Sequence, residues 1–139
     1  MTLNYSIILF LLCVSKIYCQ YCSGVFESGG GTIASPPDPG DASLYQNNAD
    51  CEWIIGVQGL LVDIAVDENF GIEFGGSCEW DWLQIEENGV IYNSKYCADG
   101  GALPGSSFTL EGPVRVTFVS DGSANDIGFS LDFDVQPPV

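Results

Sequence analysis

Three carboxylates that could form a binding site lie close together in the middle of the chain. The segment Gly71–Trp82 carries Glu73, Glu79 and Asp81, and two glycines between them allow the backbone to bend. Carboxylates held this close repel one another unless a cation or a hydrogen-bond donor joins them. No Lys or Arg lies in the segment. We therefore expect an oxygen-seeking ion such as Ca²⁺ to bind here.

The same acids give little support for catalysis. The chain contains no histidine, which excludes a Ser-His-Asp triad and a Cys-His pair. A glycosidase needs two acids on either side of a sugar cleft. Glu73 and Asp81 are better explained as ion ligands, and so short a chain leaves little room for a cleft. We expect a binding protein and not an enzyme.

The first 19 residues are predicted to be a secretory signal peptide. Lys16 is their only charge, and Ile7–Val14 is an apolar run too short to span a bilayer. Cleavage after Cys19 would leave one domain at 20–139, with its core at about 22–135. No second run of spanning length follows. The expected product is a secreted, extracellular protein.

The chain is strongly acidic. It has 19 acidic and 3 basic residues and a net charge of −16, and loss of Lys16 with the signal leaves only Lys95 and Arg115 as basic residues. Such a charge repels nucleic acid and anionic membranes and attracts cations and basic proteins. A purely solubilising role for the acids outside Gly71–Trp82 stays open.

Side-chain patterning predicts an all-β protein. Residues 114–118 and 129–135 alternate apolar and polar side chains, as strands with one buried face do. Further strands are expected at 51–57, 60–66, 82–85 and 90–92. Gln58-Gly59 would form a hairpin turn between the first two of these, and Asn88-Gly89 a turn before the last. The short strands and frequent turns favour a jelly-roll-like β-sandwich.

Four cysteines remain after removal of the signal, and an even number in an exported chain predicts two disulfides. They are Cys22, Cys51, Cys78 and Cys97. Four cysteines allow three pairings. The mature chain has neither a CxxC pair nor a histidine, which argues against a zinc site.

Several short motifs follow one another along the chain. They are Gly31–Pro36, Cys51–Ile54, Cys78–Asp81, Tyr96-Cys97, Phe118–Ser123 and Gly128–Phe133. Taken in order, over about Cys22–Val135, they resemble the motifs of a CUB domain. The resemblance implies a β-sandwich of two antiparallel sheets, disulfides Cys22–Cys51 and Cys78–Cys97, and an extracellular binding role.

The resemblance also implies a calcium site assembled from separate parts of the chain. One Ca²⁺ would be held by the carboxylates of Glu73, Asp81 and Asp121. A backbone carbonyl near Ser123 and water would complete its shell of about 6–8 oxygens.

Four further residues are expected to lie at or near this site. Tyr45 is expected to orient a ligand carboxylate, that of Glu73, by a hydrogen bond. Glu79 is expected to point outward as a bystander. Where the family often has an Asn ligand, this chain has Ala124, with Asn125 one place further on.

The expected partner is an extracellular protein with a basic surface. In calcium-binding CUB domains, the resemblance implies, the loops of the site receive a Lys side chain of the partner. The negative field of this chain would speed its approach. Two simpler roles stay open: the ion only ties the loops together, or the acids form a solvated rim without an ion. The oligomeric state is open.

Two other functions also stay open. The first is binding of carbohydrate or lipid, as in the lone-CUB proteins of seminal fluid, on a platform of Trp80, Trp82, Tyr92 and Tyr96. Against it, Trp53 and one of the pair Trp80/Trp82 are expected in the core. The second is an acidic extracellular-matrix protein that adsorbs Ca²⁺ or mineral. Its scattered acids would be Asp63, Asp67, Glu68, Glu86 and Glu87.

Overall fold

The structure, a computed structural model, describes residues 22–98 and 103–139, which form nine β-strands. The predicted signal peptide lies outside these residues. The strands are β1 (Ser23–Phe26), β2 (Gly29–Ala34), β3 (Asp50–Ile55), β4 (Leu61–Val66), β5 (Trp82–Glu87), β6 (Val90–Tyr96), β7 (Ser107–Glu111), β8 (Val114–Val119) and β9 (Ser130–Val135). The described part of the chain contains no helix of the length and hydropathy needed to cross a membrane.

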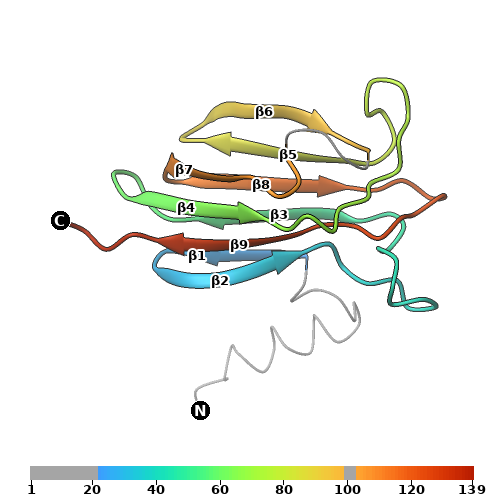
Figure 1. The fold of residues 1–139 in the computed structure, drawn as a ribbon, viewed down its shortest axis with the longest axis horizontal. Helices are drawn as coiled ribbons and strands as arrows, with labels where there is room; N and C mark the ends of the chain where they lie inside the picture. Colours follow the sequence, from blue (N-terminus) through green and yellow to red (C-terminus); the bar gives the residue numbers. More distant parts are fainter. Residues whose placement is uncertain (1–21, 99–102) are drawn as a thin grey trace, which may run out of the picture.

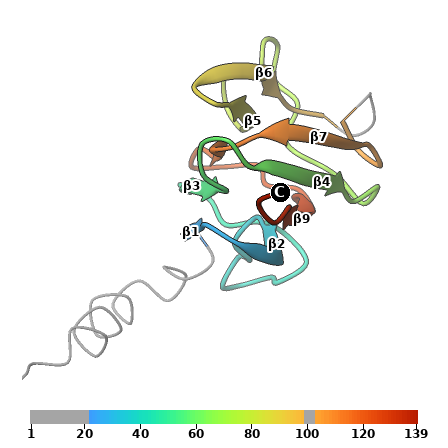
Figure 2. The ribbon, with the colours of Figure 1, turned by 90° about the vertical axis from the view of Figure 1, so that its left-hand side faces the viewer.

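The strands form two sheets packed face to face, which confirms the predicted all-β sandwich (Figures 1 and 2). The five-stranded sheet has the order β1-β3-β8-β5-β6, and the four-stranded sheet has the order β2-β9-β4-β7. All strand pairs are antiparallel except β1 and β3, which run parallel. The parallel pair is the one departure from the two antiparallel sheets that the resemblance implied.

The predicted hairpin at Gln58-Gly59 is wrong, because β3 and β4 lie in different sheets. Gly56 has a φ of 77°, and a Cβ at this position would lie 2.7 Å from Val62 Cγ2. The glycine therefore lets the chain turn tightly and cross to the other sheet, where the buried faces of β3 and β4 meet across the core. The Asn88-Gly89 turn is confirmed, since it joins the paired strands β5 and β6.

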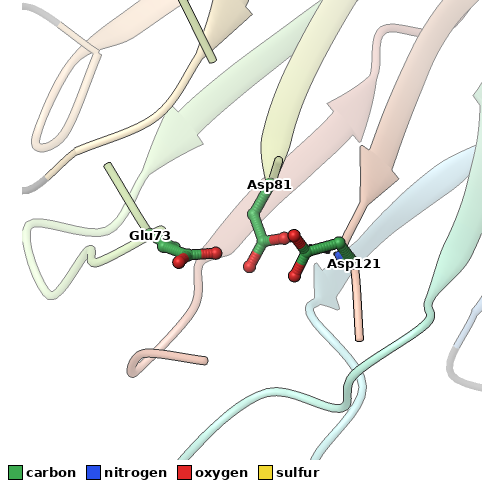
Figure 3. Close-up of side chains that lie close together, drawn as sticks. All are labelled: Glu73, Asp81 and Asp121. Atoms are coloured by element: carbon green, nitrogen blue, oxygen red, sulfur yellow. Dashed lines mark hydrogen bonds between the residues drawn. The ribbon is translucent and has the colours of Figure 1, made fainter. Parts of the chain in front are cut away.

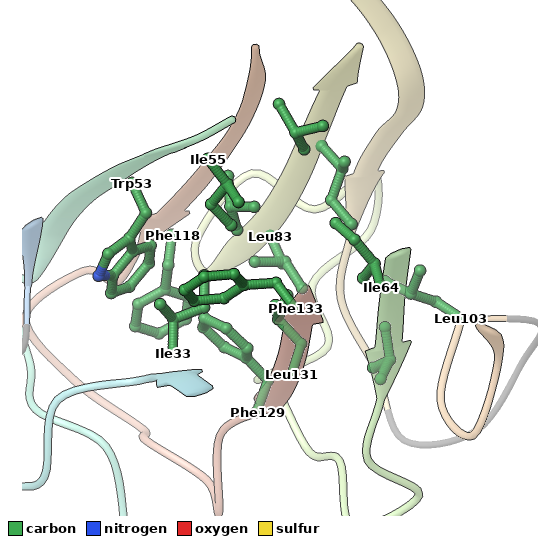
Figure 4. Packing of buried hydrophobic residues seen from close by; sticks show 14 of the residues in the cluster. Ile33, Trp53, Ile55, Ile64, Leu83, Leu103, Phe118, Phe129, Leu131 and Phe133 are labelled. Carbon is green, nitrogen blue, oxygen red and sulfur yellow. The ribbon is translucent and has the colours of Figure 1, made fainter. Parts of the chain in front are cut away.

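The core lies between the sheets and is rich in aromatic rings (Figure 4). The ring of Phe129 lies 5.9 Å from that of Trp53 and 5.4 Å from that of Phe118, centroid to centroid. At Gly31 a Cβ would lie 2.9 Å from the ring of Phe133. The glycine-rich strand β2 can therefore approach that ring closely.

Trp53 is buried, as expected, but neither Trp80 nor Trp82 belongs to the core. Strand β5 begins only at Trp82, which points outward and carries the ammonium of Lys95 at 4.4 Å from its ring centroid. The inward position next to it is taken by Asp81, which is fully buried. The expectation that one of the two tryptophans packs in the core is therefore wrong.

Both disulfides connect the cysteines as the resemblance implied, Cys22 with Cys51 and Cys78 with Cys97. They lie at the end of the sandwich where β8 ends and β3 and β5 begin, here called the loop end. Its loops are residues 36–49, 67–81 and 120–129. In the chain-entropy description each crosslink stabilises the fold by about 3 kcal/mol.

Candidate calcium centre

Strand register brings Asp81 and Asp121 together. Strands β5 and β8 are antiparallel neighbours, with Trp82 opposite Val119. Asp81 directly precedes β5, and Asp121 follows β8, so both lie at the loop end. The backbone N–H of Asp121 donates a hydrogen bond of 2.7 Å to Asp81 Oδ1. A single strand pairing thus positions two of the three predicted ligands.

Glu73 is carried to the same place by the loop between β4 and β5. Gly71 and Gly128 form an isolated bridge with backbone hydrogen bonds of 2.9 and 2.7 Å. A Cβ at Gly71 would lie 2.8 Å from Ile127 Cγ1, so a glycine permits this close approach. Beyond the bridge, the backbone N–H of Glu73 donates to Tyr45 Oη at 3.0 Å.

Tyr45 does orient a carboxylate of the site, but it is that of Asp81 and not that of Glu73. Its hydroxyl donates to Asp81 Oδ2 at 2.5 Å. Its ring is buried edge-on against Phe118, 5.2 Å between centroids. Glu73 contributes only its N–H to Tyr45, because the loop presents the backbone to the hydroxyl. Both oxygens of Asp81 therefore have donors, which fixes the orientation of this buried carboxylate.

The three carboxylates converge on one point (Figure 3). One oxygen from each of Glu73, Asp81 and Asp121 lies within 4.8 Å of the other two. Glu73 Oε2 is buried and has no hydrogen-bond partner. A buried oxygen without a donor is costly, and a Ca²⁺ ion would remove that cost. The donor set, three carboxylates and no nitrogen or sulfur, fits a hard cation.

The electrostatics of the cluster also favour a cation. Burial is the main factor that raises the pKa of Glu73, and the charges of Asp81 and Asp121 add to it. Burial likewise raises the pKa of Asp81, although hydrogen bonds from Tyr45 and from the Asp121 N–H oppose it. Burial, and then the hydrogen bond to Asp81, raise the pKa of Tyr45, which keeps its hydroxyl a donor.

Neither basic residue of the described chain neutralises these acids. Arg115 lies 3.6 Å from both Glu52 and Glu86, on the outer face of the five-stranded sheet. Lys95 lies over Trp82 and forms no ion pair among the described residues. Among the described residues, no basic side chain balances the charge of these carboxylates, so the cluster favours an added cation.

The remaining residues predicted around the site lie beside it. The N–H of exposed Ser123 donates to Asp121 Oδ1 at 3.1 Å. Ala124 has a φ of 58°. The side-chain amide of Asn125 donates to the backbone oxygen of Tyr45 at 2.6 Å, so Asn125 braces the Tyr45 loop. Glu79 is exposed, as expected for a bystander.

Sequence reasoning did not identify two residues that hold the loops together. Ser120 is buried, its hydroxyl donates to the backbone oxygen of Gln46 at 2.6 Å, and it accepts from the N–H of Ala49 at 2.9 Å. The N–H of Asn48 donates to the backbone oxygen of Asp121 at 2.7 Å. The sequence did contain a signal for Ser120: it follows a strand with alternating side chains and directly precedes Asp121.

The four aromatic residues of the predicted sugar platform do not lie on one surface. Tyr92 and Tyr96 line a groove of about 560 Å³ between β6 and β7. Trp80 lies in the loop before β5, and Trp82 lies under Lys95. The scattered acids of the matrix hypothesis are also divided. Asp63 belongs to the four-stranded sheet, whereas Glu86 and Glu87 belong to the five-stranded one.

Comparisons with known proteins agree with this architecture. The model of the CUB domain family matches residues 22–133. Protein SpAN of Strongylocentrotus purpuratus is 36% identical over 115 residues, which are 81% of this chain and 18% of SpAN. Cubilin of Sus scrofa is 35% identical over 123 residues, which are 86% of this chain and 3% of cubilin. The chain thus spans less than a fifth of either relative.

Among solved structures, the MASP-1 CUB2 domain bound to Ca²⁺ has the same fold, with a TM-score of 0.66 at 24% identity. The similarity covers 81% of this chain and 99% of that domain. Together with the family match over residues 22–133, the two sheets and the two disulfides establish what the motifs suggested. The chain belongs to the CUB domain family.

Proposed function

We propose that this protein is a secreted, calcium-dependent module that binds an extracellular protein at its loop end and is not an enzyme. The observation that carries the proposal is the buried, unpartnered Oε2 of Glu73 beside the carboxylates of Asp81 and Asp121. A related CUB domain has been solved with Ca²⁺ bound, which supports the same ion here.

The group recognised on the partner is proposed to be a Lys ammonium. Ca²⁺ carries two positive charges against three carboxylates, so the loaded centre keeps a negative charge. Asp81 is fully buried and both its oxygens have donors. Glu73 and Asp121 are only partly buried, so their oxygens are the ones that can accept from an ammonium. The acidic surface would also attract a basic partner.

The calcium step is tested by thermal melts with Ca²⁺, Mg²⁺ or a chelator. We expect Ca²⁺ alone to raise the melting temperature substantially, because it binds the folded state only. Asp121→Asn should abolish the shift. Asp134→Asn, which changes an exposed acid on the outer face of the four-stranded sheet, should retain it. Equal shifts in both variants would place the ion elsewhere.

The lysine step is tested by retention on a resin that displays lysine side chains, with Nε-acetyl-lysine resin as the control. Wild type should bind the lysine resin in Ca²⁺ and elute with chelator, and Asp121→Asn should not bind. Retention that persists in chelator would show that bulk negative charge, and not the calcium centre, binds the resin.

One observation favours carbohydrate binding as a second candidate function. The half-exposed ring of Tyr92 stacks on Phe108, 4.9 Å between centroids, in the groove between β6 and β7 that also contains Asn93 and Ser106. An aromatic face with nearby amide and hydroxyl groups suits a sugar ring. Binding to a glycan array that is lost in Tyr92→Ala and unaffected by chelator would support this candidate. Binding that Tyr92→Ala leaves intact would contradict it.

A further inference from the structure

Three large apolar side chains stand exposed at the loop end. Phe74 is 67% exposed, Trp80 is 49% exposed and Ile127 is 53% exposed. Phe74 directly follows Glu73, and Trp80 directly precedes Asp81. Exposed apolar groups that gather beside a polar site are a common mark of a protein-binding surface.

Two of these side chains pack on the loop that carries Glu73. The Trp80 ring lies so close to the backbone of Gly75 that a Cβ there would overlap it. The ring therefore packs on the segment that follows Phe74. The side chain of Ile127 lies against Gly71, where the Gly71–Gly128 bridge joins the Glu73 loop to the segment after Asp121. The three side chains thus stand on the two loops that carry the acids, Phe74 and Trp80 on one and Ile127 on the other.

We propose that Phe74, Trp80 and Ile127 form an apolar rim that selects partners in which the bound Lys is flanked by large apolar residues. The inference rests on the proposed function and specifies the partner. The acids would accept the ammonium, and the rim would cover the Lys stem and its neighbours. Aromatic residues at the centre of an interface commonly supply much of its binding energy.

Charge identifies the occupant as a foreign protein segment and not a second copy of this chain. The loop end is acidic, and a copy would bring its own strong negative charge to it. Of the two basic residues among those described, Arg115 already lies between Glu52 and Glu86, and Lys95 lies on Trp82. A basic, apolar segment of another protein complements the surface in both charge and polarity.

Two capped peptides test the rim: acetyl-Gly-Leu-Lys-Leu-Gly-amide and acetyl-Gly-Ser-Lys-Ser-Gly-amide. Their affinities would be measured in Ca²⁺ by nuclear magnetic resonance titration of the labelled protein. We expect the leucine peptide to bind about tenfold more tightly, and Phe74→Ser with Trp80→Ser to remove that preference. The variant should keep the Ca²⁺-dependent thermal shift. Val90→Ser with Ile91→Ser, which removes exposed apolar groups at the opposite end of the sandwich, should keep the preference as well.

The outcomes separate the rim from the function on which it rests. If wild type binds the two peptides with equal, Ca²⁺-dependent affinities, the apolar rim does not select partners, and lysine recognition still holds. If the Phe74/Trp80 variant still prefers the leucine peptide, the rim is not the source of that preference and the proposal is wrong. If neither peptide binds, or if both bind equally well in chelator, lysine recognition at the calcium centre fails and the rim fails with it.

Discussion

The hydroxyl of Tyr45 joins two acids of the candidate calcium centre through one oxygen. It donates to Asp81 Oδ2 at 2.5 Å and accepts from the backbone N–H of Glu73 at 3.0 Å. The tyrosine ring is anchored in the core against Phe118. Because one rigid side chain contacts both ligand segments, the geometry of the site depends on the packing of the core beneath it.

Tyr45→Phe should therefore weaken both the fold and the site. Loss of the hydroxyl leaves a buried carboxylate oxygen and an N–H without a partner, at a cost of about 1–3 kcal/mol in chelator. Calcium affinity should fall by roughly 10- to 100-fold, as it does when a group that orients a metal ligand is removed. Urea unfolding and calorimetric titration measure the two effects. Tyr92→Phe is the matched control, and an equal loss in that variant would contradict the assigned role of Tyr45.

The raised pKa of Glu73 predicts an unusual pH dependence without calcium. A carboxyl whose pKa lies above its ordinary 4.5 holds its proton to higher pH in the folded state. Its contribution to stability is complete below the unfolded pKa and is lost as pH rises through the folded pKa. In chelator, Glu73→Gln should therefore be more stable than wild type at neutral pH and equally stable below about pH 4.

With saturating Ca²⁺, wild type should be more stable than Glu73→Gln at neutral pH, because the variant lacks one of the proposed calcium ligands. Melting temperatures across this pH range, with and without chelator, measure the difference. Glu79→Gln, which changes the exposed acid of the same loop, should follow the wild-type curve. A difference between wild type and Glu73→Gln that stays constant with pH would show that burial does not perturb this carboxyl.

Ala124 is expected to limit calcium affinity. Its φ of 58° lies in the left-handed region, which Asn adopts more readily than Ala. Ala124→Asn should stabilise the loop and supply an amide oxygen close to Asp121, so calcium should bind more tightly. Ala124→Gly relieves the same backbone strain without adding an oxygen. If both variants raise the affinity equally in a calcium titration, strain relief and not a new ligand is the cause.

The two disulfides should differ in their effect on calcium. Cys78 lies in the loop between Glu73 and Asp81, so replacing Cys78 and Cys97 by Ala should lower both calcium affinity and stability, the latter by about 3 kcal/mol. Replacing Cys22 and Cys51, which connect β1 to β3, should cost similar stability and leave affinity nearly unchanged. Urea unfolding and calcium titration of the folded variants measure both effects. Equal losses of affinity would show that the fold as a whole, and not the local loop, sets the binding.

The sequence predicted the strands correctly where every second side chain is apolar and packs in the core. Val114, Val116 and Phe118 predicted β8 in this way. Strand β2 was missed because its glycines leave no side chains to alternate. The reason for a glycine at Gly31 is the ring of Phe133, a contact with a residue far away in the chain. The false hairpin at Gln58-Gly59 has a related cause, since a local turn signal does not reveal which sheet the next strand joins.

That the three acids lie together agrees with the prediction, but the connections of the candidate calcium centre could not be predicted. The motifs identified the acids and Tyr45, yet the tyrosine is separated by 28 residues from Glu73 and by 36 from Asp81. Which carboxylate receives its hydrogen bond depends on the path of the loop, and that path is set by the Gly71–Gly128 bridge. No local pattern contains this information.

The crosslinks of the sandwich are concentrated at one end. Both disulfides lie at the loop end, and Ca²⁺ would add a further link there between residues 40 positions apart, Asp81 and Asp121. Among the residues that the structure describes, the opposite end has no disulfide and is closed by turns such as Asn88-Gly89. Amide hydrogens should therefore exchange faster at those turns than in the crosslinked loops around the site. A partner that binds the loops would meet segments that crosslinks already restrain, so less conformational entropy would be lost when the complex forms.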